Sequence, residues 1–160
     1  MKTIPWEVDD SRFSNSYVAG FLDGDGSIVA TVEKRPERRR FPYRIRLKIN
    51  FTQHIRHIDL LRKLKKFLGD RGTVRMVQAH NLAELVVQDR QGVKEVLERL
   101  LPHIILKQRQ AKIMLAVINI YENAKVNTRS SLSEKEFAKI LSMVREIRNL
   151  NSRTGGKIKL

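Results

Sequence analysis

The chain has 160 residues, 41% of them hydrophobic, which fits a single domain over residues 1–160 with a sizeable core. Lysine and arginine number 32 against 17 aspartate and glutamate, so the formal net charge is +15 and we expect a polyanionic partner. Cysteine is absent, which excludes disulfides and thiolate metal sites. No apolar run approaches the roughly 20 residues that cross a bilayer, so we expect no membrane partner. The N-terminus, MKTIPWEVDD, has no apolar run typical of a signal peptide.

Periodicity predicts five helices and four strands, the strands in two pairs. The first helix is expected from Ser11, as N-cap, to about Leu22. Alternation and β-branched residues predict the strands, and amphipathic spacing predicts the other helices. The strands are expected at 27–34, 43–52, 72–78 and 82–89, and the helices at 57–69, 93–104, 107–124 and 133–151, the last capped by Ser133. This order predicts an α+β fold with a four-stranded antiparallel sheet, and a frayed tail from about residue 152.

The second strand, YRIRLKINF, alternates between apolar and polar side chains. Its polar positions are Arg44, Arg46, Lys48 and Asn50, which fall on one face about 7 Å apart. Such a row can enter a DNA groove, where arginine pairs with guanine and asparagine with adenine. A solvated basic face is the plain alternative, but the net charge and the adjoining RPERRR loop favour DNA contact, and Arg75 of the third strand extends the row.

The stretch GFLDGDGSIVA places two aspartates where the first helix gives way to a strand. A simple turn is one interpretation, since Asp and Gly form turns. An EF-hand is excluded because its sixth position would be Ile28 and its twelfth Lys34. The third interpretation is a divalent-metal site for phosphodiester chemistry, in which a cation relieves the carboxylates at the negative end of the helix.

Small residues precede this stretch at Ser16, Ala19 and Gly20. A glycine inside a helix costs about 1 kcal/mol relative to alanine, so its presence calls for a reason. Small residues spaced by one turn let two helix backbones approach closely. The neighbouring helix can belong to the same chain or to a second copy.

The segment YVAGFLDGDGS, residues 17–27, resembles the signature of the LAGLIDADG homing endonucleases, and the αββαββα order resembles their fold over nearly the whole chain. One copy of the motif and the chain length match the single-motif members, which act as homodimers. The resemblance implies packing of the motif helices through Ser16, Ala19 and Gly20. It also implies a metal site at Asp25 and the carbonyl of Gly24.

Further roles follow only from the resemblance. Gln53 matches a residue near the attacking water and Lys107 an active-site lysine, whereas His57 replaces a family arginine and its role stays open. DNA contacts are expected along the loop and strands, at Thr31, Arg35, Arg38, Arg40, Arg44, Arg46, Lys48, Asn50 and Arg75.

The implied activity is a staggered double-strand break in double-stranded DNA at a long, roughly palindromic site, initiating intron homing. Mg²⁺ is the expected cofactor, Mn²⁺ a substitute, and Ca²⁺ an ion that supports binding without cleavage. The resemblance also favours an organellar location, because many single-motif members are encoded in chloroplast or mitochondrial introns. Two alternatives remain: an intron RNA maturase, and a DNA-binding regulator that has lost cleavage.

Overall fold

The computed structural model describes residues 8–38, 42–124 and 132–152. The helices in this part of the chain are α1 Asn15–Asp25, α2 Ile58–Phe67, α3 Arg90–Leu100, α4 Gln108–Asn123 and α5 Glu134–Asn151. The strands are β1 Gly26–Lys34, β2 Tyr43–His54, β3 Thr73–Val77 and β4 Leu82–Val87. The predicted α+β fold and the αββαββα order are confirmed.

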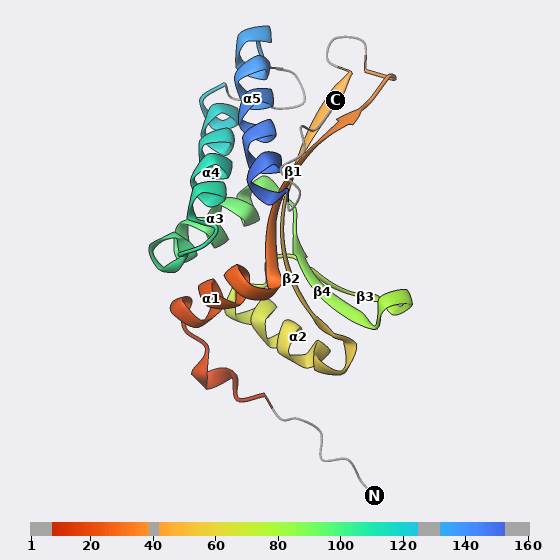
Figure 1. Cartoon of the computed structure of the whole chain (residues 1–160), viewed down its shortest axis with the longest axis vertical. Helices are drawn as coiled ribbons and strands as arrows, with labels where there is room; N and C mark the ends of the chain where they lie inside the picture. Colours follow the sequence, from red (N-terminus) through yellow and green to blue (C-terminus); the bar gives the residue numbers. More distant parts are fainter. Residues whose placement is uncertain (1–7, 39–41, 125–131, 153–160) are drawn as a thin grey trace, which may run out of the picture.

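The four strands form one antiparallel sheet in the order β1-β2-β4-β3. The hairpin of β1 and β2 is paired from Gly26 with Phe51 to Lys34 with Tyr43. Strand β4 pairs only with the second half of β2, from Ile49 to His54. The outer half of the first hairpin therefore projects beyond the rest of the sheet (Figure 1).

The two faces of the sheet differ in what covers them. The five α-helices in Figure 1 lie on one side of the curved sheet, and none of them covers its concave side. On the helix side, alternate residues of β1 and β2 are at most 3% exposed: Ile28, Ala30, Leu47, Ile49 and Phe51. The core therefore lies between the convex face and the helices, which leaves the opposite face free for a partner.

Helix α1 begins and ends three residues later than predicted. Ser14, not Ser11, is its N-cap, and the Ser14 hydroxyl accepts a 3.1 Å hydrogen bond from the Tyr17 N–H. The chain before it is a short 3₁₀ turn followed by extended backbone at Phe13, which separates Ser11 from the helix. The helix then runs through Asp25, and β1 starts at the next residue. Asp23 and Asp25 therefore lie in the last turn of the helix and not in a turn between helix and strand.

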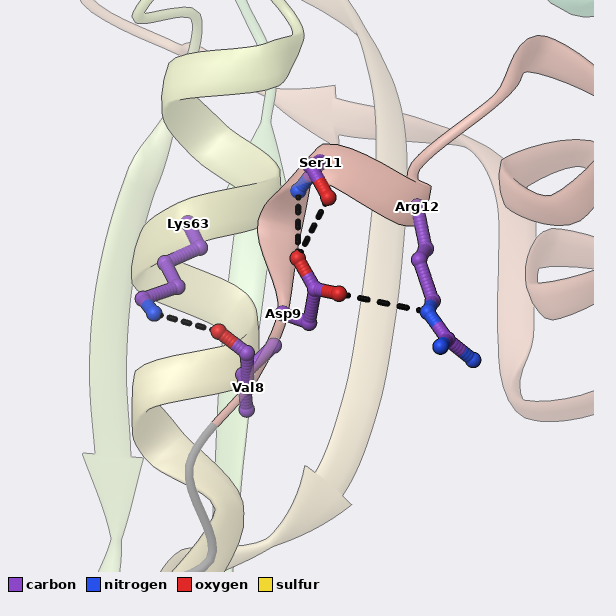
Figure 2. A network of polar contacts seen from close by, with 5 residues as sticks. All are labelled: Val8, Asp9, Ser11, Arg12 and Lys63. Atoms are coloured by element: carbon purple, nitrogen blue, oxygen red, sulfur yellow. Dashed lines mark hydrogen bonds and ion pairs between the residues drawn. The ribbon is translucent and has the colours of Figure 1, made fainter.

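Hydrogen bonds stabilise the segment before α1, both within the segment and to α2 (Figure 2). The Asp9 carboxylate accepts hydrogen bonds from the Ser11 N–H and the Arg12 Nε, both at 3.2 Å. The Lys63 ammonium, on α2, donates to the carbonyl oxygen of Val8. These bonds fix the chain direction at the entry to α1.

The remaining helices match their predicted ranges with small shifts. Helix α3 begins at Arg90 and not at 93, because Asp89 caps it by accepting from the Gly92 N–H at 2.6 Å. The predicted cap of α5 is confirmed, since Ser133 and Glu136 form a capping box. No helix of the described ranges is long and apolar enough to span a bilayer. The predicted contact Arg40 and the tail from 153 lie outside the described residues.

Candidate active site and nucleic-acid interface

Asp25 is an exposed carboxylate at the junction of α1 and β1. Its Oδ2 accepts a 2.9 Å hydrogen bond from Nε2 of Gln53. The pairing of Gly26 with Phe51 explains the contact: antiparallel strands place the residue that follows Phe51 by two beside the end of α1. The bond leaves the other Asp25 oxygen free of any hydrogen bond within the described part of the chain.

The junction depends on the absence of a side chain at Gly26. A Cβ there would lie 2.8 Å from the carbonyl oxygen of Asn50 and 2.9 Å from Cα of Leu22. Backbone atoms of α1 and β2 therefore approach each other where a larger residue could not fit. This contact fixes Asp25 close to the end of β2.

Asp23 faces a different neighbour, the loop just before α4. Its Oδ2 accepts hydrogen bonds from the N–H groups of Ile105 (2.8 Å) and Leu106 (3.0 Å), and its Oδ1 from the Lys107 N–H (3.0 Å). The Lys107 ammonium donates in turn to the Asp23 carbonyl oxygen. Burial acts to raise the pKa of Asp23, but the three N–H donors outweigh it and hold this pKa below its ordinary value.

These contacts correct the expectation that a bound cation relieves both aspartates. For Asp23 the relief comes from the N–H groups of the loop just before α4 and from the Lys107 ammonium. We name the four residues Asp23, Asp25, Gln53 and Lys107 the α1 junction. The structure brings them together at the end of α1 from three distant parts of the chain.

The donors at this junction suit a hard divalent cation but do not complete its shell. Asp25 offers a carboxylate, and the carbonyl of Gly24 lies in the last helical turn, where carbonyls have no partner within the helix. Among the described residues no group of three or more His, Cys, Asp or Glu is arranged to hold a metal. Mg²⁺ prefers six oxygen ligands and keeps several waters, so water, phosphate or a second copy would have to supply the rest.

The predicted row on β2 occupies the open side of the sheet. Arg44 and Arg46 are exposed and Lys48 is half-buried, whereas Asn50 is only 9% exposed. Thr31 lies opposite Arg46, and Arg75 lies on β3 opposite Glu84. We name this surface the basic face; its residues are Thr31, Arg44, Arg46, Lys48, Asn50 and Arg75.

Acidic side chains form ion pairs with several arginines of the basic face and its adjoining loop. Glu33 accepts from Arg46 at 2.9 Å and lies 3.2 Å from Arg35, which is also 3.7 Å from Glu37. The hydrogen bond from Arg46 and the neighbouring arginine charges hold the pKa of Glu33 below its ordinary value. Within the described ranges no hydrogen bond or ion pair engages the side chains of Arg44 and Lys48.

A polar chain crosses all four strands near the junction. The Ser27 hydroxyl donates to Oδ1 of Asn50, whose Nδ2 donates to Glu84 at 3.4 Å. Glu84 also accepts from Nε of Arg75 at 2.8 Å. The sequence prediction missed Glu33 and Glu84, although both stand at alternating positions of their strands that could have placed them on this face.

A cavity of about 850 Å³ extends the basic face past the edge of β4. It lies beside the outer half of the first hairpin and is lined by residues that include Arg38, Arg44 and Lys48. Arg90, at the start of α3, also lines it, and its guanidinium stacks 4.4 Å from the ring centroid of Tyr121. Arg90 is a further cation that the sequence did not single out.

The exposed side of α1 bears on the predicted subunit contact. Ser16 and Gly20 are exposed, and a Cβ on Gly20 would meet nothing within 4 Å. Ala19 is fully buried in the core of its own chain, so its predicted place in an interface is wrong. His57 is the N-cap residue of α2 and is partly buried.

Comparison with known proteins agrees with this geometry. The family model for LAGLIDADG endonucleases matches residues 18–104. The DNA endonuclease I-CvuI of Chlorella vulgaris is 36% identical over 73% of this chain and 70% of its own length. The DNA endonuclease I-CreI of Chlamydomonas reinhardtii is 30% identical over 84% and 77%, respectively.

The similarity extends to three dimensions. The crystal structure of I-CvuI in complex with its target in the presence of 2 mM Ca superimposes with a TM-score of 0.76 and 27% identity. The match covers 91% of this chain and 85% of that one. The family model spans more than half of the chain, and the fold superimposes over most of its length, so the chain belongs to the LAGLIDADG endonuclease family.

Proposed function

We propose that this chain is a site-specific homing endonuclease that makes a staggered, Mg²⁺-dependent double-strand break in a long, pseudo-palindromic DNA site. One observation carries the proposal. Gln53 donates to Asp25, and Lys107 donates to the Asp23 carbonyl, so both side chains reach the last turn of α1, next to a basic face that no helix of the described chain covers. The relatives I-CvuI and I-CreI are named DNA endonucleases, which favours DNA cleavage over a maturase role.

Three residues of the α1 junction, together with Gly24, have positions and contacts that support a role in this reaction. Asp25 and the carbonyl of Gly24 would hold the metal, which supplies activation of water and stabilisation of charge on the phosphate. Gln53 donates a hydrogen bond from its side-chain amide to Asp25, so its Oε1 can accept a hydrogen bond from the attacking water. Lys107 keeps a positive charge beside the scissile phosphate, where negative charge grows during hydrolysis.

The basic face would lie in the DNA groove. Arg44 and Lys48, which no described acid engages, fit phosphate contacts, and Arg46 and Arg75 are held in fixed orientations that suit base edges. Thr31, Asn50, Arg35 and Arg38 lie along the same surface or its adjoining loop, and Arg90 would extend it at the cavity. Together they match the excess of positive charge in the chain.

We further propose that the active form is a homodimer with α1 at its centre. Gly20 and Gly24 leave open space on one side of α1, and nothing in the described chain accounts for either glycine. Three large apolar side chains close to this helix are exposed: Tyr17 (47%), Ile105 (88%) and Leu106 (73%). A second copy would cover them and add a second Asp25 to the metal site. The repulsion between the two carboxylates would be offset by bound cations.

The test begins with selection of a duplex from a library of randomised palindromes by binding in Ca²⁺. The unaltered protein and Asp25→Asn are then compared on that duplex with Mg²⁺, Mn²⁺ and Ca²⁺. We expect both proteins to bind, and only the unaltered one to cut, with Mg²⁺ or Mn²⁺. Asp59→Asn, which removes an exposed carboxylate on α2, is the matched control and should cut normally.

Two results would contradict the proposal. Cleavage by Asp25→Asn at the normal rate would remove that carboxylate from the chemistry. Binding of intron RNA by a protein that cuts no selected duplex would instead support the maturase alternative.

A further inference from the structure

The loop from Ile105 to Lys107 is held almost entirely by one residue of another helix. It connects a 3₁₀ turn, Leu101–His103, to α4, and its three N–H groups all donate to the carboxylate of Asp23. The contact joins segments that lie 82 to 84 residues apart in the chain. It therefore ties the start of α4 to the end of α1.

Lys107 is bound by Asp23 at both of its ends. Its N–H donates to Oδ1 of Asp23 at 3.0 Å, and its ammonium donates to the Asp23 carbonyl oxygen. A lysine stem normally samples many rotamers, and fixing it costs up to about 2 kcal/mol of conformational entropy. A residue that restrains the main chain and the charged end together reduces the positions that the ammonium can take.

The charges of the two helix ends are also matched. The Asp23 carboxylate lies at the N-terminal end of α4, where anions are stabilised, and the Lys107 ammonium lies at the C-terminal end of α1, where cations are stabilised. Reversal of the charge at either position would place it next to a helix end of the same sign, which is unfavourable. The pair is therefore favourable in the arrangement that holds the Lys107 ammonium at the C-terminal end of α1, the same helix end that carries Asp25.

Packing does not explain how this loop is fixed. Ile105 and Leu106 are 88% and 73% exposed, so their side chains add almost nothing to the core of the chain. The neighbouring residue Ile104 is 2% exposed and anchors the chain before the loop. Loss of the Asp23 carboxylate would thus release the loop while the core stays packed.

We propose that Asp23 is a positioning residue for Lys107, holding the lysine in the place from which it acts on the scissile phosphate. The inference rests on the proposed function, because it assumes that Lys107 takes part in DNA cleavage. Asp23 itself touches neither substrate nor metal in this role. Its first effect is on the rate of cleavage and not on affinity for DNA.

The test is a double-mutant cycle with Asp23→Asn and Lys107→Met, which keeps an unbranched stem without the charge. Cleavage is followed in a single turnover with excess protein on the duplex selected in Ca²⁺, and affinity is measured in Ca²⁺. We expect Asp23→Asn to slow cleavage about 10- to 100-fold, within the range typical of lost positioning, with affinity changed less than about threefold. In the Lys107→Met background the same change should slow cleavage less than about twofold.

Circular dichroism melting of each variant, with Asp59→Asn as control, checks that the fold is kept. Independent effects, in which the double variant shows the product of the two single losses, would overturn the proposal. So would a normal rate for Asp23→Asn, or a variant that does not fold, because the loop would then be part of the support of the core. If the unaltered protein cuts no selected duplex, it is the proposed function that fails.

Discussion

The α1 junction and the basic face hold their polar groups in different ways. At the junction, Gln53 donates to Asp25, and Lys107 donates to Asp23. One carboxylate oxygen of Asp25 has no hydrogen bond within the described residues. On the basic face, opposite charges are paired along the strands, and Arg44 and Lys48 stand without a described partner. Most bonds of the junction join a side chain to the main chain, whereas those of the face join side chains to each other.

This difference fits the two tasks. Hydrolysis needs a few atoms at fixed positions, and main-chain hydrogen bonds supply them at low entropic cost. Recognition of a long duplex needs many cationic side chains, which can leave an acidic partner within the protein and bind a phosphate or a base instead. Substitutions at the junction should therefore alter the cleavage rate, and substitutions on the face should alter affinity, salt dependence and base preference.

After Asp25→Asn, which should not cut at all, the largest effect is expected from Gln53→Ala. The change removes both the donor to Asp25 and the acceptor proposed for the attacking water, so single-turnover cleavage should fall about 100-fold, the lower range for lost proton-transfer or solvent-positioning groups. Affinity in Ca²⁺ should change little. Gln91→Ala, which removes an exposed glutamine on α3, is the control and should cut normally. A loss of affinity equal to the loss of rate would show that the two regions are not separate.

Gly26→Ala tests the support of the junction. The new Cβ would meet backbone atoms of Asn50 and Leu22 below 3.0 Å, so we expect a loss of about 2 kcal/mol in the free energy of unfolding, as for other overpacked sites. Gly20→Ala is the matched change, because its new Cβ meets nothing in the chain itself; at a protein concentration low enough to keep the chain monomeric it should stabilise the chain by up to about 1 kcal/mol. Urea denaturation of both variants measures the difference. Equal stabilities would mean that the close approach at Gly26 is relaxed without cost.

The basic face could be predicted from the sequence because its determinant is local. Strict alternation in β2 places Arg44 and Arg46 on one side and Leu47 on the other wherever the strand pairs. The two strand pairs and most helices follow from the same kind of pattern. The family motif similarly pointed to Asp25.

The contacts of the junction could not be predicted in this way. Asp23 contacts Lys107 only because packing of the whole core brings α1 and the start of α4 together. No spacing of residues in the sequence indicates this contact. The start of α1 was misplaced because Ser11 and Ser14 are both good caps, and the choice is made by the bonds of Asp9 with Ser11 and Arg12. Ala19 was misassigned because the pattern of small residues does not tell which side of the helix faces the core.

Within the basic face, free and paired cations should behave differently. Arg44→Ala with Lys48→Ala should lower affinity about tenfold and reduce the slope of log K against log salt by about 0.9 for each phosphate that the variant no longer neutralises. Arg46→Ala should reduce this slope less, because Glu33 already offsets part of its charge. Fluorescence anisotropy on the selected duplex at several salt concentrations gives both slopes. An unchanged slope for the double variant would remove these two residues from the phosphate contacts.

The smallest effect is expected from Glu84→Gln, which keeps the shape of the side chain and removes its charge. Exposed ion pairs contribute about 0.2–1 kcal/mol, so affinity for the selected duplex should change less than about fivefold. The base preference under Arg75 should nevertheless relax, because Glu84 orients the guanidinium through a 2.8 Å hydrogen bond. Binding to duplexes with each base at that position measures the preference, with Glu98→Gln on α3 as control. If the preference is unchanged, Glu84 only balances charge on the face, and its bond to Arg75 carries no specificity.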